Sequence, residues 1–154
     1  MDLVEAGPAD VETLVDLWFS LATEMERYSR FNELSYSSRD DVSGDGFREL
    51  LASEDVRVVL IRDEATVGYL VLREGTHPSR TCAEYVRLVD LLVREEYRDR
   101  GYGSAAVEAV KVMAREEGYD LLKVACEWRN EGARRFYRGH DFEPKQVEFV
   151  HDLA

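Results

Sequence analysis

The sequence predicts a single α/β domain in which helices flank a mixed central β-sheet. The length of 154 residues suits one domain with one sizeable core, and 45% hydrophobic with 34% charged residues is a globular composition. Segments with helical spacing of apolar residues alternate with β-branched runs, in the order β-α-(α)-β-β-β-α-β-α-β. We therefore expect residues 1–154 to form one domain.

The N-terminal part predicts a strand and an amphipathic helix. Residues 2–6 form the first expected strand. Pro8 suits the first turn of a helix over 8–26, in which apolar residues recur at helical spacing. Residues 27–46 are rich in Ser, Asp and Arg and predict a loop with short helical pieces, and loops of this length are often functional. A short helix is expected over Phe47–Ala52.

A hairpin and a long strand follow. The segments Val56–Arg62 and Thr66–Arg73 are β-branched and apolar, and the residues between them form a turn. The segment Glu84–Val93 predicts the next strand.

The last third predicts two helices around a strand, and then a closing strand. A helix is expected over Gly103–Glu117, where Gly118 ends it. A strand over Asp120–Glu127 and a short helix over Asn130–Arg138 follow. One or two closing strands are expected between Phe142 and Leu153.

The charge of the chain excludes some partners. The formal net charge is −12, from 32 acidic and 20 basic residues. A surface this acidic disfavours non-specific contact with nucleic-acid phosphates. Only three of the basic residues are lysine, and an acidic, lysine-poor surface resembles that of proteins from salt-loving organisms. The chain is therefore expected to be either halophilic or an ordinary acidic protein.

Membrane and metal sites are not predicted. No apolar run reaches the ~18 residues of a membrane span, and the N-terminus lacks the regions of a signal peptide. We therefore expect a cytoplasmic protein that does not bind membranes. Cys82 and Cys126 are expected to be reduced and mostly buried, and no Cys or His spacing suggests zinc.

The stretch EYRDRGYGSAA, from Glu96 to Ala106, joins a predicted strand to a predicted helix. Helix N-termini carry unpaired N–H groups and a partial positive charge, and glycines let a ligand approach the backbone closely. Arg98 and Arg100 add charge. The stretch therefore predicts a site for a polyanion such as a pyrophosphate, with a solvated glycine turn as the alternative.

A dinucleotide site fits this stretch poorly, although GYGSAA matches Gly-x-Gly-x-x-Ala and Glu127 ends the next strand. In a dinucleotide-binding fold the first glycine follows the strand almost directly and the motif opens the fold. Here the segment from Arg94 to Arg100 intervenes, and most of the chain precedes the motif.

Another family fits better. The order Arg98-x-x-Gly101-x-Gly103, after a strand that ends in Leu91-Leu92-Val93, resembles the acetyl-CoA signature of the GNAT family of N-acetyltransferases. Further along, NEGARRFYRGHDF resembles the second signature of that family. Its matching positions are Asn130, Ala133, Phe136, Tyr137 and Phe142. The resemblance covers residues 56–143 well and extends loosely to the first strand and helix.

The resemblance implies a GNAT fold, in which the fourth and fifth strands (84–93 and 120–127) splay apart. It implies that freed backbone groups of the fourth strand pair with the pantetheine of acetyl-CoA, and that amides of the next loop hold the pyrophosphate. The implied cofactor-binding residues are Leu91, Leu92, Val93, Arg98, Asp99, Arg100, Gly101, Tyr102, Gly103, Ser104 and Asn130. A side chain in place of Gly103 is expected to occupy the pyrophosphate's position. Arg134 and Arg138 are expected either at the outer phosphate of CoA or in surface salt bridges.

The implied reaction is direct transfer of an acetyl group from acetyl-CoA to a primary amine in a ternary complex, without a metal. Tyr137 is the candidate acid for the leaving thiolate, because its reference pKa is near 10 against about 8.5 for a thiol. Asp90 is the candidate base, with acceptor binding or plain solvation as equal alternatives. Glu84 is a weaker base candidate. Cys126 as an acyl-carrying nucleophile is disfavoured, because no His/Asp partner set is evident.

Two other readings stay open. The same fold could serve as a non-catalytic acyl-CoA-binding sensor, or as a partner-dependent subunit that docks another protein through residues 27–46. The expected partner is a small-molecule or peptide amine, while nucleic acid and membrane are not expected, and a homodimer is left open. The identity of the amine does not follow from the sequence.

Overall fold

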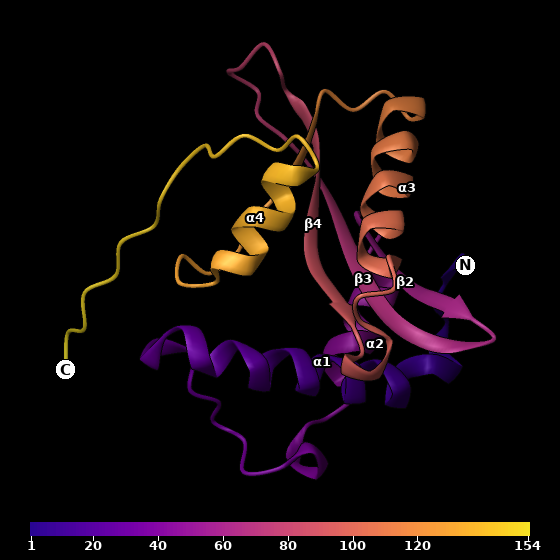
Figure 1. Ribbon diagram of the computed structural model, residues 1–154, viewed down its shortest axis with the longest axis vertical. Helices are drawn as coiled ribbons and strands as arrows, with labels where there is room; N and C mark the ends of the chain where they lie inside the picture. Colours follow the sequence, from indigo (N-terminus) through magenta and orange to yellow (C-terminus); the bar gives the residue numbers. More distant parts are fainter.

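The computed structural model describes residues 1–154 and contains one five-stranded sheet in the order β1-β2-β3-β4-β5 (Figure 1). The first three pairs are antiparallel, and β4 and β5 are parallel. The strands are β1 (Asp2–Glu5), β2 (Val56–Asp63), β3 (Ala65–Thr76), β4 (Glu84–Val93) and β5 (Leu121–Val124). The predicted mixed sheet is therefore confirmed.

Helices cover both faces of the sheet. They are α1 (Val11–Met25), α2 (Asp45–Ala52), α3 (Tyr102–Glu116) and α4 (Glu131–Gly139). Short 3₁₀ turns are Pro8–Asp10, Glu26–Tyr28, Arg30–Asn32, Arg39–Asp41 and Glu95–Tyr97. The helix predicted over 8–26 thus consists of α1 with a 3₁₀ turn at each end.

The core consists of two apolar clusters, one on each face. On one face, α1 and Phe47 of α2 pack against Tyr69, Val71 and Leu92 of the sheet. On the other face, α3 packs against a second set of strand residues, with Phe136 and Tyr137 of α4 at its margin. Burial of each such side chain contributes roughly 1.5–3 kcal/mol, so the two clusters fix which face each helix covers.

A β-bulge in β4 lies at the point where β4 and β5 part. Val71 lies opposite Asp90, whereas Leu72 lies opposite Leu88, so Val89 has no partner in β3. The parallel pairing of β4 with β5 covers only Tyr85–Leu88. Beyond Leu88, β4 continues for five residues with an open edge, which is the splay that the resemblance implies.

Two predictions about secondary structure were wrong. The closing strands expected between Phe142 and Leu153 are absent, because no part of residues 142–154 pairs with another strand of the chain. The strand expected over 120–127 is shorter, because β5 ends at Val124 where β4 leaves it. A strand needs a neighbour for its backbone groups, so a local pattern alone does not fix where it ends.

The prediction that the cysteines are buried was also wrong. Cys82 lies in the loop between β3 and β4, and Cys126 lies just after β5; both are exposed. Neither position belongs to the apolar clusters, so their hydrophobic character is not used in the core. No helix of the structure has both the length and the apolar character needed to cross a membrane.

Candidate active site

The open edge of β4 forms the centre of the candidate site. Leu91, Leu92 and Val93 pair with β3 on one side, while β5 does not reach them on the other. Leu92 packs into the α1 cluster and Leu91 against the α3 cluster, so both side chains are used in the core and the backbone faces the gap. An extended ligand with amide groups can pair with such an edge as a strand does.

Gly68 of β3 sets the position of this edge, and sequence analysis missed it. A Cβ at Gly68 would lie 2.0 Å from the carbonyl oxygen of Leu92, so only glycine lets β3 approach β4 here. An isolated glycine inside an apolar strand pattern is a known sign of close backbone approach, and it could have indicated this residue.

The loop after β4 turns sharply into α3. The amide of Arg94 donates to the carbonyl of Val67 at 2.7 Å, which ends the β3–β4 ladder. Asp99 has φ 61° and Gly101 has φ 85°, and Gly101 is the N-cap of α3. Only glycine adopts this left-handed conformation without cost. The turn brings the predicted residues from Arg98 to Ser104 together at the helix start, where unpaired amides favour an anion.

Two side chains of this region hold the helix start in place. The Tyr102 hydroxyl donates to Asp63 Oδ2 at 2.5 Å, which ties α3 to the β2–β3 turn. The Ser104 hydroxyl lies 3.0 Å from His140 Nε2, whose ring also contacts Glu108. Both hydroxyl groups are thus engaged within the chain, so Tyr102 and Ser104 can contribute to an anion site through their backbone amides.

The structure shows which protein atoms a side chain at Gly103 would meet. A Cβ there would contact Phe136 at 3.6 Å and Val93 at 3.9 Å, both ordinary distances. A side chain here therefore has room beside α4 and β4, and packing between these elements does not require a glycine at this position.

The two arginines of the motif differ in their availability. Arg98 Nε donates to the Val93 carbonyl at 2.8 Å, and its Nη2 donates to Glu24 Oε1 of α1 at 2.5 Å. This guanidinium thus joins the end of β4 to α1. Arg100 lies over the Tyr97 ring at 5.6 Å, remains exposed, and is the arginine of the motif free to meet an anion.

Asn130 caps α4. Its Oδ1 accepts a hydrogen bond from the Ala133 amide at 3.0 Å, so the oxygen serves the helix and only the amide nitrogen of the side chain is available to a ligand.

Tyr137 lies between two aromatic rings on the α3 face. Its ring contacts Phe136 and Phe142 in edge-to-face geometry, with centroids 5.1 and 5.5 Å away. Burial, and secondarily the Cys126 thiol, raises the pKa of Tyr137 to about 12, with no hydrogen bond contributing to the shift. The phenol is therefore protonated at neutral pH.

Asp90 is the first paired residue after the bulge, and it contacts one polar side chain. The Tyr69 hydroxyl donates to Asp90 Oδ2 at 2.9 Å. Burial raises the pKa of Asp90, and the bond from Tyr69 opposes that rise. Tyr69 itself is fully buried, and burial together with the Asp90 charge raises its pKa far above the ordinary value. Sequence analysis missed Tyr69, whose partner lies 21 residues away.

Asp90 and Tyr137 lie on opposite faces of the sheet. Tyr69, the partner of Asp90, belongs to the cluster beneath α1 and α2, whereas Tyr137 packs against the cluster beneath α3. The two faces are connected through the gap between β4 and β5, which opens after Leu88.

The weaker base candidate Glu84 and the disfavoured nucleophile Cys126 are placed less favourably for catalysis than Asp90. Glu84 begins β4, six residues before Asp90, which is about 20 Å along a strand. Desolvation raises the pKa of the Cys126 thiol against the opposing effect of Arg134, so Cys126 is not an activated thiolate.

Two guanidinium groups near the gap have an orphaned donor. The Nε atoms of Arg94, which follows β4, and of Arg134, in the first turns of α4, are buried without a hydrogen-bond partner. Arg134 also lies over the Trp128 ring at 4.3 Å. Buried donors normally find an acceptor, so these two Nε atoms are exceptions within the chain.

The segment 27–46 is ordered and borders the gap. Asn32 Nδ2 donates to the Met25 carbonyl at 3.0 Å and to Glu127 Oε1, beyond β5, at 2.9 Å. Arg39 binds Asp16 and Glu12 of α1. The segment therefore lies along α1 and reaches the end of β5 on the Asp90 side.

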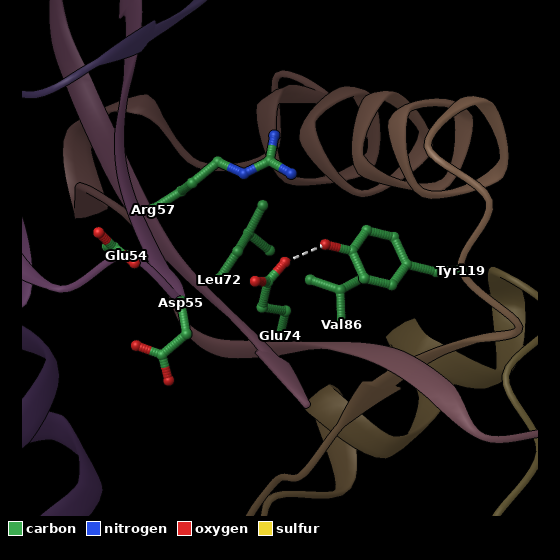
Figure 2. A pocket seen from close by; sticks show the side chains of 7 residues that line it. All are labelled: Glu54, Asp55, Arg57, Leu72, Glu74, Val86 and Tyr119. Carbon is green, nitrogen blue, oxygen red and sulfur yellow. Dashed lines mark hydrogen bonds between the residues drawn. The ribbon is translucent and has the colours of Figure 1, made fainter. Parts of the chain in front are cut away.

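A separate cavity lies at the other end of the sheet (Figure 2). It has a volume of about 20 Å³, and three of its polar lining residues are paired: the Tyr119 hydroxyl donates to Glu74, and Arg57 forms an ion pair with Glu117 nearby. This space holds about one water molecule, so the cavity is structural.

Comparison with known proteins identifies the family. The model of the Acetyltransferase (GNAT) family matches residues 16–142, a range that includes both motifs and the whole of the gap. The chain belongs to the GNAT acetyltransferase family. No curated protein matches the chain.

Solved structures share the GNAT fold over nearly the whole chain. A variant of the BH1408 protein from Bacillus halodurans is 20% identical with a TM-score of 0.85, covering 99% of this chain and 100% of its own. An aminoglycoside acetyltransferase from an uncultured soil metagenomic sample is 18% identical with a TM-score of 0.72, covering 99% and 96%. The ribosomal-protein-alanine N-acetyltransferase from Brucella melitensis is 15% identical with a TM-score of 0.74, covering 99% and 100%. At these identities the likeness shows the fold.

In this GNAT chain no group of three or more His, Cys, Asp or Glu side chains is arranged to hold a metal ion. Of the cofactor-binding residues expected from sequence, Leu91–Val93 lie on the open edge of β4, the residues from Arg98 to Ser104 lead into α3 and begin it, and Asn130 caps α4. The structure draws attention to Gly68 and Tyr69, which the sequence analysis did not name, and it shows buried Nε atoms without an acceptor in Arg94 and Arg134.

Proposed function

We propose that the protein transfers an acetyl group from acetyl-CoA to a primary amine by direct attack in a ternary complex. The parting of β4 from β5 after Leu88, beside the start of α3, is the observation that carries this proposal. It provides an open strand edge next to a helix N-terminus, which matches a ligand with two amides and a pyrophosphate.

Acetyl-CoA is the proposed co-substrate. Its pantetheine pairs with the edge of Leu91–Val93, and the amides from Arg98 to Ser104 bind its pyrophosphate. Arg94 and Arg134 supply the buried donors that the chain itself leaves without acceptors. Arg100 adds an exposed positive charge.

The reaction needs a base on one face and an acid on the other. The acceptor enters from the face of α1 and the segment 27–46, and loses a proton to Asp90, directly or through water. The neutral nitrogen attacks the thioester carbonyl and forms a C–N bond, and an amide of the open β4 edge binds the oxyanion. The nitrogen of this tetrahedral intermediate then loses its second proton to solvent as the C–S bond breaks. The leaving thiolate takes a proton from Tyr137, which regains a proton from solvent.

Burial acts on both partners of the last proton transfer. It raises the pKa of Tyr137 to about 12, which holds the proton on the phenol before reaction. The same apolar surroundings disfavour a thiolate, so the sulfur is a stronger base there than in water and takes the proton more readily.

The acceptor is proposed to be a cationic amine. The acidic chain attracts cations, and two structural relatives are named for aminoglycosides and for the alanine of a ribosomal protein. A cytoplasmic setting remains the expectation from sequence.

A screen with detection of the released thiol tests the proposal. The panel contains aminoglycosides, polyamines, amino acids, lysine peptides and peptides with free N-termini, each at low and at multimolar salt. Turnover with at least one amine is expected. Binding of acetyl-CoA by calorimetry, without turnover on any amine, would instead support an acyl-CoA sensor.

A further inference from the structure

A row of three cationic side chains crosses three strands of the sheet, and we call it the cationic row. Arg73 of β3 lies opposite Arg87 of β4, and Arg87 lies opposite Lys123 of β5. None of the three forms an ion pair with a carboxylate of the chain, although acidic residues outnumber basic ones by 32 to 20. Like charges directly opposite one another destabilise a sheet, so the fold by itself does not explain this row.

The cationic row lies on the same face of the sheet as α1, beyond the area that α1 covers. The next residues along the three strands pack into the α3 cluster; they are Leu72, Leu88 and Val124. Because successive side chains of a strand point to opposite faces, the row points to the face of α1. The α1 cluster includes β3 only as far as Val71 and β4 only at Leu92, so it does not reach the row. Arg73 is exposed, and Arg87 and Lys123 are half-buried.

The bulge in β4 brings the cationic row and Asp90 onto one face. Residues three apart on a regular strand point to opposite faces, but the bulge at Val89 adds one residue between Arg87 and Asp90. Their partners on β3 are Arg73 and Val71, which are two residues apart and therefore share a face. Two residues span about 7 Å of a strand. The proposed base thus lies one short step along the sheet from the centre of the row.

Two aromatic rings hold the Lys123 end of the row in place. The His77 ring stacks on the Tyr85 ring with centroids 4.6 Å apart, and Lys123 Nζ lies 4.2 Å from the Tyr85 centroid and contacts His77 Nε2. Desolvation, and then the charges of Arg87 and Lys145, lowers the pKa of Lys123. Desolvation, and then Lys123 and other nearby cations, likewise lowers the pKa of His77. The positive charges are thus crowded, and an anion among them would relieve their mutual repulsion.

We propose that the cationic row binds an anionic group of the acceptor, so that the acceptor is a zwitterion with its amine at Asp90 and a carboxylate or phosphate at Arg87. This inference rests on the proposed function, because it assigns the second end of the acceptor in the same site. A guanidinium group forms paired hydrogen bonds with either oxyanion, and the charges of Arg73 and Lys123 flank it on both sides.

The cationic row selects among amines that the acidic chain attracts in general. A net charge of −12 draws cations toward the protein as a whole, and the row is a local exception on the side of Asp90 away from Leu92. An acceptor with a second cationic group at this distance from its amine meets repulsion there, whereas an anionic group meets three unpaired cations. The row therefore favours zwitterionic amines over diamines of the same length.

Turnover of matched acceptor pairs tests the proposal. ω-Amino acids of increasing length are compared with their carboxamides, and aminoalkyl phosphates with the corresponding amino alcohols, so that the amine and the spacer stay constant within each pair. For at least one length, the anionic compound is expected to have a kcat/KM roughly tenfold or more above that of its neutral partner. The difference should lie mainly in KM, because the contact forms before the reaction and persists through it. Neutral partners that react as well at every length overturn the proposal.

Replacement of Arg87 shows whether the preference comes from the cationic row. Arg87→Gln is expected to raise KM for the anionic acceptor roughly tenfold and to leave the neutral one within about twofold. Arg62→Gln is the matched control, because it removes the same charge from an exposed position of β2 and should keep the preference. Since Arg87 has like charges on both sides, its replacement should not lower the melting temperature. A preference that survives in Arg87→Gln, or a variant far less stable than Arg62→Gln, overturns the proposal.

Calorimetry separates failure of this inference from failure of the proposed function. The anionic compound and its neutral partner are each titrated into the full chain in the presence of CoA. Tighter binding of the anionic compound that is lost in Arg87→Gln, without turnover of any amine, would refute acetyl transfer and retain the cationic row as an anion site. Turnover of both compounds with equal KM would refute the anion site and retain acetyl transfer. Neither turnover nor a difference in binding would refute both.

Discussion

The hydroxyl of Tyr69 donates a hydrogen bond to Asp90 Oδ2 across 2.9 Å, directly after the bulge in β4. It is the one polar contact that shifts the pKa of this half-buried carboxyl group, and no other charged group contributes to the shift. The bond positions the proposed base and favours its ionised form.

Tyr69→Phe is expected to shift the pH dependence of the reaction. Without the hydroxyl, burial acts on Asp90 unopposed and its pKa rises further. Because the base must be ionised, the acidic limb of the kcat/KM profile moves to higher pH, and the rate recovers in alkaline buffer. An unshifted profile with a uniformly lower rate would mean that Tyr69 only supports the fold.

Asp90→Asn is expected to abolish most activity while stabilising the protein at neutral pH. The amide oxygen can still accept the bond from Tyr69. The folded-state pKa of Asp90 is raised, so its contribution to stability is present in acid and is lost as pH rises through that pKa. The rate falls by roughly 10²- to 10⁴-fold.

Thermal unfolding checks the stability part of this prediction. At pH 7 the melting temperature of Asp90→Asn should exceed that of the wild type, and below the unfolded-state pKa, about 3.9, the difference should vanish. A variant less stable than the wild type at pH 7 would contradict the assigned direction of the pKa shift.

Tyr137→Phe is expected to lower kcat and kcat/KM together, by roughly 10²- to 10⁴-fold. The phenyl ring keeps its contacts with Phe136 and Phe142, so stability and acetyl-CoA affinity should change little. Single-turnover rates are needed, because chemistry must limit the comparison. A loss below about threefold would remove Tyr137 as the acid, since it falls far short of a general-acid contribution.

Gly68→Ala is expected to weaken acetyl-CoA binding and to destabilise the fold. The new Cβ would lie 2.0 Å from the Leu92 carbonyl oxygen, so the edge that binds pantetheine must move, at a cost of about 1–3 kcal/mol. Gly46→Ala is the control, because no atom lies within 4 Å of a Cβ at this position of α2 and its φ is unstrained. Calorimetry and thermal unfolding measure both effects, and equal behaviour of the two variants would refute the assignment of Gly68.

Salt is expected to stabilise the protein. The chain carries a net charge of −12, and self-repulsion is screened as the Debye length falls from about 10 Å at 0.1 M to about 3 Å at 1 M salt. The melting temperature should rise between about 0.1 M and about 1 M KCl. A melting temperature that stays constant or falls with KCl would contradict the hypothesis of a halophilic protein. It would not affect the proposed acetyltransferase function.

The fold and the two motifs could be predicted because they depend on local patterns. Apolar spacing predicts α1 and α3, and the glycines and arginines near residue 101 predict a sharp turn into a helix. The family resemblance then supplied the splay, which no local pattern encodes.

The remaining features depend on contacts between distant residues. The bulge at Val89 sets Asp90 against Val71 and brings its carboxyl group to the Tyr69 hydroxyl, a relationship visible only once the register is known. The sequence predicted that Arg98 adds positive charge to an anion site. In the structure its guanidinium donates a hydrogen bond to Glu24, 74 residues earlier in the chain. Residues 146–150 have the pattern of a strand but pair with no other strand of the chain.

A single-turnover experiment with acetyl-labelled acetyl-CoA tests the central claim most directly. Enzyme in excess is mixed with the labelled compound, first alone and then with the best amine from the screen, and the protein and the amine are analysed by mass spectrometry. Direct transfer predicts an unlabelled protein throughout, and a label that moves to the amine as an equal amount of CoA is released. A label on the protein, at Cys126 or elsewhere, or a label that stays on CoA with every amine, would contradict it.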